Sequence, residues 1–378
     1  MLPKLSLKQK TTLLEHFSDP EDIYACENFG RVPGVTSEMA DVLENKDLTA
    51  AQGVLTNCKK KDIGILTILD AAYPKRLFNI HEPPILLYYK GVLPDFEKQP
   101  VIGVVGTRRA SGYGLNNARQ MAAQITNCGG LVVSGGAGGI DTTALEGALE
   151  AGGPAVAVLG CGVDVAYPRN NRMLFSKIEA NGCLISEYLP GTQPKPWQFP
   201  ERNRIISGLS NGVLVVEAPE KSGALNTARH ALEQGRDVFA VPGNVDSPSC
   251  RGSNGLLEEG AYPALSGWGV VRQYAPEYPA SVAQKPMIPE NLEPAAAKAD
   301  KKSIDKLENS TYSVVNKPTP ALSDSEQVVL ARLDKTPMAL DTLIDSLDLS
   351  AMSVKSILTK LTVKGLVVNH PGGRVSRK

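Results

Sequence analysis

The stretch VIGVVGTRRASGYG, residues 101–114, decides the fold, because an apolar run of strand length passes directly into a turn with glycines and two arginines. The same kind of run recurs at 131–136 (LVVSGG), 154–160 (PAVAVLG), 183–188 (CLISEY), 212–218 (GVLVVEA) and 237–243 (DVFAVPG). Runs begin some 23 to 30 residues apart, the length of one βα unit. Continuous Val/Leu/Ile runs are typical of strands covered by helices on both faces. The sequence therefore predicts an α/β fold with a doubly wound, mostly parallel, extended Rossmann-like sheet.

Composition divides the chain into four parts. Residues 1–65 read as short helices, with Thr36 after a Pro-Gly turn as an expected N-cap. Residues 66–278 carry the sheet, and residues 279–318, rich in Pro, Ala and charge without an apolar period, are expected to be a flexible linker. Residues 319–378 form the last part. The first part has the shape of a helix–hairpin–helix or sterile-alpha-motif-like unit, which can either contact DNA phosphates or act as a small packing module.

The last part has the pattern of a winged helix. Three helical stretches, at 323–333, 338–347 and 350–366, precede two expected strands joined by a Pro-Gly-Gly turn. In the third stretch, after Ser350 as the expected N-cap, the apolar residues that share one face are Val354, Ile357, Leu358 and Leu361. The basic residues here are Lys355, Lys360, Lys364, Arg374, Arg377 and Lys378. This mixed charge fits a helix in a DNA groove or a protein contact, and both interpretations stay open.

Overall composition limits the possible partners and compartments. Lys plus Arg and Asp plus Glu number 40 each in the 378 residues, so a nucleic-acid site must be a local patch. The six cysteines are scattered without a C-x-x-C pair, which predicts reduced thiols and no zinc site. Residues 1–10 lack the apolar core of a signal peptide, and no stretch offers the ~18 apolar residues of a membrane span. We therefore expect a soluble, cytoplasmic protein without metal or cofactor.

The turns after the strands carry groups that suit a phosphate. In an open parallel sheet, right-handed crossovers bring the carboxyl ends of all strands to one edge. The turn at 106–114 brings two arginines, and the glycines of 134–141 (SGGAGGID) allow backbone amides and a helix dipole to hold an anion. The stretches 167–171 (YPRNN) and 199–204 (FPERNR) add arginine and asparagine, which can bind phosphates and base edges. Candidate stacking surfaces are Tyr113, Tyr167 and Phe199.

In order and spacing, these motifs resemble those of the DNA-processing protein A (DprA/Smf) family. They are GTRRASGYG, SGGAGGID, AVLGCGVDVAYPRNN, ISEYLPG, FPERNRIISGLS, VVEAPEKSGALNTA, FAVPGN and GSNGLLEEGA, preceded by LTILDAAYPKRLFNIHEPPILLYYKG at 66–91. The resemblance covers most of the chain. It implies a Rossmann-like domain that binds single-stranded DNA, forms a homodimer and helps to load RecA recombinase onto incoming DNA during natural transformation.

Carried over residue by residue, the resemblance implies a site for single-stranded DNA. Its members are Arg108, Ser111, Gly135, Gly136, Arg169, Asn170, Arg202, Asn203, Arg204 and Lys221. Arg108 is expected to contact the DNA backbone with Ser111 beside it. Two positions depart from the family's pattern: Leu145 stands where the family commonly has histidine, and Gly138 where it often has a larger or basic residue. The role of those two side chains is therefore open.

Two enzyme classes share this kind of sheet. A dinucleotide-dependent enzyme needs G-x-G-x-x-G directly after a strand, which the first strand does not supply. A nucleotide phosphoribohydrolase uses P-G-G-x-G-T-x-x-E, but the nearest match, from Ser222 onward, has His230 at the position of the catalytic glutamate. Glu187 and Glu217 also end strands, where a carboxylate more often caps a loop or pairs with arginine. Cys161 is better explained by the fit of a small residue in a tight turn than as a reactive thiol. We expect no enzymatic activity, with the phosphoribohydrolase as the alternative.

Overall fold

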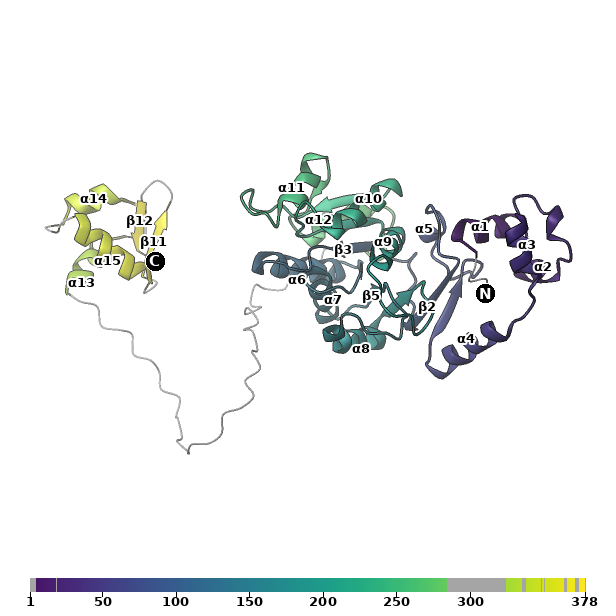
Figure 1. Cartoon of the computed structure of the whole chain (residues 1–378). Coiled ribbons are helices and arrows are strands. Elements are labelled where there is room, and N and C mark those ends of the chain that lie inside the picture. The colour runs from purple at the N-terminus through teal and green to yellow at the C-terminus, as the bar shows by residue number, and fades with distance from the viewer. Residues whose placement is uncertain are drawn as a thin grey trace, which may run out of the picture. The chain divides into compact units, whose positions relative to one another are not determined.

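The computed structural model describes residues 5–17, 19–283, 324–334, 338–347, 349, 351–363, 366–370 and 374–377. The chain divides into two compact units, residues 1–293 and 294–378, which are described separately (Figure 1). Within these described ranges, no helix combines the length and the apolar character that crossing a bilayer requires.

A nine-stranded sheet forms the centre of the first unit. Its strands are β1 (Gly64–Thr67), β2 (Leu86–Gly91), β3 (Val101–Val105), β4 (Leu131–Ser134), β5 (Ala155–Val158), β6 (Cys183–Ser186), β7 (Gly212–Val215), β8 (Asp237–Ala240) and β9 (Tyr262–Pro263). They are ordered β1-β2-β6-β5-β4-β3-β7-β8-β9. All pairings from β6 to β9 along this order are parallel, whereas β2 pairs with β6 and β1 with β2 in antiparallel fashion. The mostly parallel sheet predicted from the sequence is confirmed, and each of the six apolar runs forms one strand.

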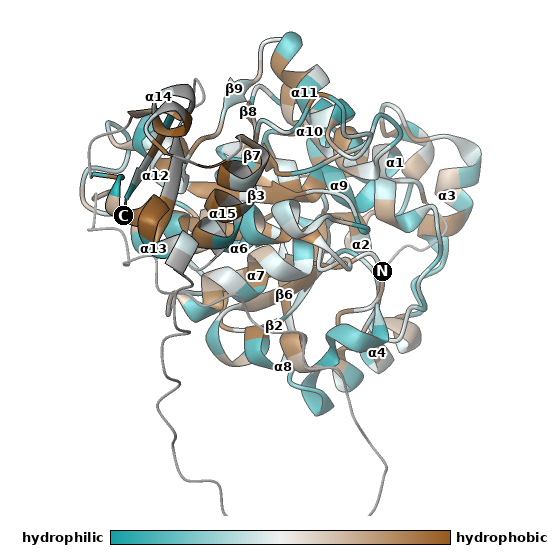
Figure 2. Cartoon of the chain, turned by 90° about the vertical axis from the view of Figure 1, so that its left-hand side faces the viewer, coloured by the Kyte–Doolittle hydropathy of each residue, from teal (hydrophilic) through white to brown (hydrophobic). Residues whose placement is uncertain are grey.

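The central strands are buried on both faces. In β3, Ile102 and Val104 belong to one apolar core, whereas Val101 and Val105 belong to the core on the opposite face. This arrangement explains why the strand sequences are continuously apolar rather than alternating. Figure 2 shows the brown, hydrophobic strands enclosed by helices with teal, hydrophilic stretches.

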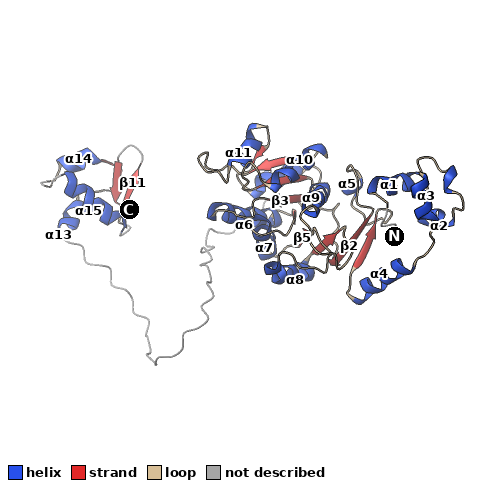
Figure 3. Ribbon diagram, in the orientation of Figure 1, coloured by secondary structure: helices blue, strands red, loops and turns tan. Residues whose placement is uncertain are grey.

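Helices cover the two faces of the sheet in two groups (Figure 3). The group that shares a core with Ile102 is α6 (Gly112–Asn127), α7 (Ile140–Glu150), α8 (Arg172–Asn181) and α12 (Gly267–Val271). The group on the opposite face is α5 (Lys75–Phe78), α9 (Gln198–Leu209), α10 (Gly223–Glu233) and α11 (Arg251–Glu258). Two short 3₁₀ helices adjoin the first group in the chain: η2 (Arg169–Asn171) directly precedes α8, and η3 (Arg272–Tyr274) directly follows α12.

The order of the strands reverses at β3. From β3, the chain continues through β4, β5 and β6 toward one side of the sheet, and then returns through α9 to place β7 and β8 on the other side. The strands β3 and β7 are neighbours, and the chain leaves β3 toward β4 on one side and β7 toward β8 on the other. The connections that follow these two strands therefore run in opposite directions. Ligands of open α/β sheets bind in the crevice that such a switch point creates.

The N-terminal helices form a small core of their own. They are α1 (Leu7–His16), α2 (Pro20–Ala25), η1 (Phe29–Arg31) and α3 (Ser37–Glu44), whereas α4 (Thr49–Lys60) buries Cys58 in the core that it shares with the sheet. Thr36 caps α3 as predicted, because its Oγ1 accepts a hydrogen bond from the Met39 amide at 3.3 Å. Leu13, Phe29 and Met39 are buried in this core. An ion pair of 2.5 Å between Lys61 and Asp164 joins the end of α4 to the loop after β5.

The second unit is a winged helix, as predicted. Its elements are α13 (Asp324–Ala331), β10 (Met338–Ala339), α14 (Leu340–Asp345), α15 (Ala351–Val363), β11 (Val367–His370) and β12 (Arg374–Arg377). The four apolar residues expected on one face of α15 are buried together. One prediction was wrong in detail: residues 338–339 were assigned to a helix, but they form β10, which pairs with β12. Ser350, Lys364 and Lys378 lie outside the described residues.

The expected linker, residues 279–318, lies mostly outside the described residues. Its first five residues, 279–283, are described and are part of the first unit. Val282 packs on the apolar core, and the Ala283 amide donates a hydrogen bond to the Cys128 carbonyl at 3.3 Å. The packed part of the domain therefore continues beyond residue 278, because Val282 is an apolar side chain that the core can bury.

Candidate nucleic-acid interface

Two adjoining clefts open at the carboxyl edge of the parallel strands. The first has a volume of about 430 Å³ and the second of about 380 Å³. Both are bordered by Arg108, Ala137, Phe199 and Arg202, so the two clefts meet at these residues. Small-molecule sites have volumes of roughly 300–1,000 Å³, and each cleft can therefore hold a group of nucleotide size.

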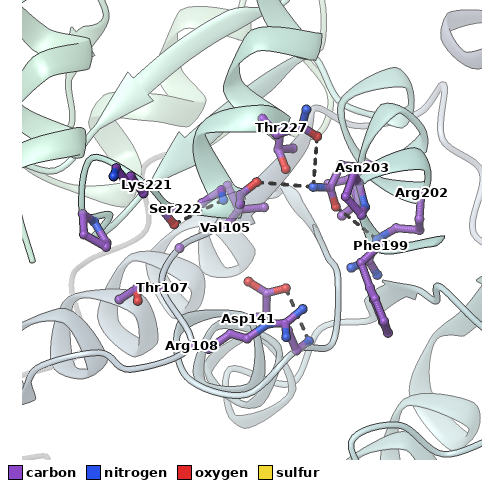
Figure 4. A pocket seen from close by; sticks show the side chains of 18 of the residues that line it. Val105, Thr107, Arg108, Asp141, Phe199, Arg202, Asn203, Lys221, Ser222 and Thr227 are labelled. Carbon is purple, nitrogen blue, oxygen red and sulfur yellow. Dashed lines mark hydrogen bonds between the residues drawn. The ribbon is translucent and has the colours of Figure 1, made fainter. Parts of the chain in front are cut away.

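The first cleft lies at the switch point of the sheet. Its walls come from the turn after β3 (106–109), the first turns of α9 and the segment 219–227, which leads from β7 into α10. Lys221 is exposed, and Ser222 caps α10 by accepting a hydrogen bond from the Ala224 amide at 3.3 Å. Figure 4 shows Lys221 and Ser222 on the opposite side of this cleft from Phe199. Because the cleft includes the N-terminus of α10, the helix dipole favours an anion there.

The glycine loop, residues 135–139, borders the second cleft and leads into α7. Gly139 has a φ of 79°, a backbone angle that residues other than glycine rarely adopt. Within the described residues, the amides of Gly138 and Gly139 donate to no protein acceptor, and they stand at the positive end of α7. Asn171 supports the loop, because its Nδ2 donates to the Gly136 carbonyl at 2.9 Å. The loop is thus held in a form that presents amides to an anion.

Arg108 borders both clefts, and its charged side chain is exposed there. Its Cζ lies 5.4 Å from the centroid of the Phe199 ring, and that ring lies 5.4 Å from the Tyr167 ring at an angle of 35°. Arg108 is exposed, and it forms no ion pair with any residue in the described part of the chain. A guanidinium held beside an aromatic surface can bind a phosphate while a base lies against the ring.

Arg202 borders both clefts as expected, but it is buried and bonded to the protein. Its exposed fraction is 4%, and Nη1 donates to the carbonyl of Gly135 at 2.7 Å and to that of Val158. The helix begins at Gln198, so Arg202 lies one turn inside α9 rather than at its start. Burial lowers the pKa of Arg202 to about 10, which leaves it charged at neutral pH. The structure therefore gives Arg202 a positioning role, in which it holds the ends of β4 and β5.

Asp141 lies next to Arg202 beneath the glycine loop. Its exposed fraction is 6%, and its carboxyl accepts hydrogen bonds from the amides of Gly106, Gly135 and Ala137. Burial raises the pKa of Asp141 to about 6, and the Arg202 charge opposes this rise. The carboxyl group therefore ties the turn after β3 to the turn after β4.

Two of the expected site residues, Arg204 and Ser111, line neither cleft. Arg204 donates from Nη2 to both carboxylate oxygens of Glu187, at 2.7 and 2.9 Å. Ser111 caps α6, because its Oγ accepts from the Gly114 amide at 3.1 Å and donates to Glu217 at 2.9 Å. The same contacts confirm the interpretation of the two carboxylates, since Glu187 pairs with an arginine and Glu217 caps a loop.

The remaining expected residues divide between the two clefts. Asn203 and Lys221 line the first cleft, whereas Gly135 and Asn170 line the second. Arg169 is exposed next to Asn170 and lines neither cleft. Gly136 is part of the glycine loop and has a positive φ of 65°.

Reasoning from the sequence missed several polar residues of the clefts: Thr107, Asp141, Asn171, Asn226 and Thr227. Asp141 and Asn171 stand inside the motifs that were considered, but a motif does not show which polar side chains turn inward. One signal was present for Asp141, because a carboxylate in the first turn of a helix is stabilised by the helix dipole.

The two departures from the family's pattern have different consequences. Leu145 is fully buried in the core beneath α7 and lines neither cleft, so its side chain has no place at the interface. Gly138 borders the second cleft, and a Cβ at this position would meet nothing within 4 Å. A larger residue therefore fits at 138, and glycine leaves the second cleft wider.

The structure also describes the surroundings of His230 and Cys161, the remaining catalytic candidates from the sequence. His230 lies 3.3 Å from Glu233 on α10 and does not line the first cleft, and burial lowers its pKa. Cys161 is buried, with Sγ 3.3 Å from the Val165 carbonyl that it donates to. Burial raises the pKa of the Cys161 thiol to about 11, which disfavours the thiolate. The interpretation of Cys161 as a small residue in a tight turn is confirmed.

Sequence comparisons with known proteins agree on one family. Residues 64–275 match the family model described as DNA recombination-mediator protein A, and residues 316–373 match the DprA winged helix domain. The chain is 34% identical to protein Smf of Synechocystis sp., over 97% of this chain and 94% of that protein. It is 44% identical to DNA processing protein DprA of Streptococcus pneumoniae, over 55% of this chain and 73% of that protein.

Solved structures show the same similarity. The X-ray structure of DNA processing protein A from Streptococcus pneumoniae matches with a TM-score of 0.61 and 36% identity, covering 71% of this chain and 94% of that one. DNA processing protein A from Helicobacter pylori, whose structure was solved for its single-stranded DNA binding mode, matches with a TM-score of 0.52 and 29% identity. That match covers 57% of this chain and 97% of the other.

Proposed function

Because this chain belongs to the DprA/Smf family of DNA-processing proteins, we propose that the two clefts at its strand ends bind single-stranded DNA. The observation that carries the proposal is the arrangement of the clefts. Each includes the N-terminus of a helix, α10 in the first and α7 in the second, and the Arg108–Phe199 pair stands between them. The Helicobacter relative, which binds single-stranded DNA, adds support from outside the chain.

Phosphates of the strand have three kinds of partner at this edge. Lys221 and the start of α10 serve the first cleft, Arg108 serves the junction, and the amides of Gly138 and Gly139 serve the second cleft. Arg202 contributes positive potential from beneath, since its hydrogen bonds go to protein carbonyls. These contacts do not read sequence, so binding tolerates any base order.

Bases of the strand have aromatic and amide partners. The rings of Phe199 and Tyr167 lie beside Arg108, and Asn170 and Asn203 line the second and first clefts. An unpaired base can stack on a ring and bond through its edge, whereas the bases of a duplex are already stacked and paired. The interface therefore favours a single strand over a blunt duplex.

In the cell, this function fits a mediator that protects incoming single-stranded DNA and passes it to RecA recombinase in the cytoplasm during natural transformation. The role is one of binding, without a chemical step. Membership of the family supports the RecA partner and the homodimer.

A homodimer through the sheet domain gains support from the β9 end of the sheet. Val245 follows β8 and Leu265 follows β9, and their exposed fractions are 78% and 80%. Exposed apolar side chains near a sheet edge suit association of two copies. We expect Leu265→Glu to lower the sedimentation coefficient of the full chain toward that of a monomer, and an unchanged coefficient would place the dimer surface elsewhere.

A binding titration with the purified full chain tests the proposed function. Fluorescence anisotropy of a labelled oligonucleotide should show tight binding of the single strand and weaker binding of the blunt duplex. The logarithm of the affinity should fall steeply with that of the salt concentration, by about 0.7 for each phosphate contact. Equal affinity for duplex, or no dependence on salt, contradicts the proposal. Release of free base from nucleotides in a parallel assay would instead favour the phosphoribohydrolase alternative.

A further inference from the structure

The two sides of the first cleft differ in chemical character. Lys221, Ser222 and the start of α10 make one side cationic and polar, and Figure 4 shows Phe199 across from them. Pro196 and Pro200 add to the side that begins α9. A nucleotide has one anionic part, the phosphate, and one flat, weakly polar part, the base. The phosphates therefore suit the α10 side, and the bases suit the α9 side.

An exposed tryptophan stands in the chain between two residues that line the first cleft, Pro196 and Phe199. Trp197 is the N-cap residue of α9, directly after Pro196 and two residues before Phe199. Its exposed fraction is 53%, although tryptophan is the largest aromatic side chain. Consecutive Cα atoms are about 3.8 Å apart, so the Cα atom of Trp197 lies at about that distance from the Cα atom of Pro196, which lines the cleft.

The Trp197 ring packs against the ring of Tyr188. Its ring lies edge-to-face with that of Tyr188, with centroids 6.2 Å apart and an angle of 77° between the planes. The Tyr188 hydroxyl donates to the Gln198 carbonyl at 3.3 Å and lies 3.2 Å from Glu201, which fixes it to α9. A half-exposed ring that already packs against another ring loses little freedom when a base stacks on it.

We propose that Trp197 is a stacking platform for the base of the nucleotide that leaves the first cleft, next to the nucleotide that contacts Phe199. The inference rests on the proposed function and adds a base site to it. Stacking on an aromatic ring depends on the area of the base rather than on its hydrogen-bonding edge. The platform therefore accepts any base, and purines bind it more strongly than pyrimidines.

Tryptophan fluorescence gives a direct test, because the chain has two tryptophans. Trp268 packs against the apolar core of the first unit, so Trp268→Phe leaves Trp197 as the sole emitter. Titration of this full-length variant with single-stranded DNA should quench the emission with the same midpoint as the anisotropy titration. The Trp197→Phe variant, which keeps Trp268, should show no quenching. Emission of Trp197 that stays constant while anisotropy reports binding overturns the platform.

Affinity measurements separate stacking from a structural role. Trp197→Ala should weaken binding of single-stranded DNA by about tenfold, within the range found for loss of one stacked base, and Trp197→Phe should recover most of it. Tyr24→Ala removes an equally exposed ring, with an exposed fraction of 50%, from the N-terminal helices and should have no effect. Urea denaturation of all three variants checks that the fold is intact.

Oligonucleotides that lack one base at successive positions complete the test. The wild type should lose affinity when the base over Trp197 is missing, and Trp197→Ala should be insensitive to the same missing base. A tenfold loss in Trp197→Ala without this coupling means that Trp197 only shapes the loop, which overturns the inference. Whether or not this coupling is found, normal binding of single strands by the wild type leaves the proposed function standing. If the wild type does not bind single strands, both the proposed function and the role of Trp197 are wrong.

Discussion

At the residue scale, three arginines near one sheet edge have three different environments. Arg108 is exposed beside Phe199, Arg202 is buried and bonded to two carbonyls, and Arg204 is paired with Glu187. An arginine whose donors already have protein acceptors contributes potential and rigidity, whereas one with free donors can take a phosphate. The three side chains are therefore not interchangeable as binding residues.

Replacing Arg108 with alanine should weaken binding of single-stranded DNA without affecting the fold. A hydrogen bond to a charged group contributes about 1.5–3 kcal/mol, so we expect a loss of roughly 10- to 100-fold for all sequences alike. The slope of log affinity against log salt should become shallower by about 0.7. Arg229→Ala, an exposed arginine on α10 with a loose 3.8 Å contact to Glu233, is the matched control. Normal binding by a folded Arg108→Ala variant would contradict the assignment of this residue.

Asp141 should make the stability of the protein depend on pH. Its pKa of about 6 in the folded state lies above its ordinary value of 3.8, so protonated Asp141 favours folding. This contribution is complete below about pH 3.8 and is lost as the pH rises through 6. The shift corresponds to about 3 kcal/mol.

The neutral variant Asp141→Asn isolates that contribution. The free energy of unfolding of the wild type, relative to that of the variant, should fall by about 3 kcal/mol between pH 3 and pH 7. Urea denaturation of both proteins across this range measures the difference. Curves that stay parallel over the range would mean that Asp141 titrates at its ordinary pKa.

At the element scale, the glycine loop between β4 and α7 determines the shape of the second cleft. A Cβ at Gly135 would lie 2.6 Å from both Arg202 Nη2 and Asp141 Oδ2, which is too close for any side chain. A Cβ at Gly138 would have open space. Gly135 is therefore needed because a side chain there would displace the buried Arg202 and Asp141, whereas a side chain at position 138 would point into free volume.

Alanine at these two positions should have opposite outcomes. Gly135→Ala should lower the free energy of unfolding by about 1–3 kcal/mol, the usual cost of overpacking, and should weaken DNA binding because it displaces Arg202 and Asp141. Gly138→Ala should leave stability within about 0.5 kcal/mol of the wild type. Thermal unfolding and anisotropy titrations of both variants provide the comparison. Equal effects at the two positions would show that the space around Gly135 is not what makes glycine necessary there.

At the scale of the whole molecule, the two units have separate apolar cores. The winged helix buries its residues around Leu343, Val354 and Leu361, and the first unit has the clefts entirely within its own residues. We therefore expect the first unit to fold and to keep the shape of its clefts without the second.

A chain truncated after residue 283 should bind single-stranded DNA within about threefold of the full chain, because all cleft residues are kept. Truncation after residue 278 is the comparison, since it removes the packing of Val282 and the hydrogen bond of Ala283, and it should be less stable. Both are measured by anisotropy and by urea denaturation. A large loss of affinity in the longer fragment would give the winged helix a direct part in binding the single strand.

The sequence by itself determined the architecture of this protein. Continuous apolar runs at the spacing of βα units specify strands covered on both faces, and this pattern can be read from the order of residue types along the chain. The winged helix and the Thr36 cap follow from equally local patterns. The sequence also predicted the sheet edge at which the clefts lie, because right-handed crossovers bring the carboxyl ends of all parallel strands to the same edge.

Only the tertiary structure decided which residues at that edge are free to bind. Arg202 and Arg204 look like Arg108 in the sequence, yet the carbonyls of Gly135 and Val158 and the carboxylate of Glu187 engage them. The partner of a charged side chain is set by residues distant in the chain, which a local pattern does not contain. For the same reason Asp141 was missed and Trp197 was not noticed, because burial and exposure are properties of the packed molecule.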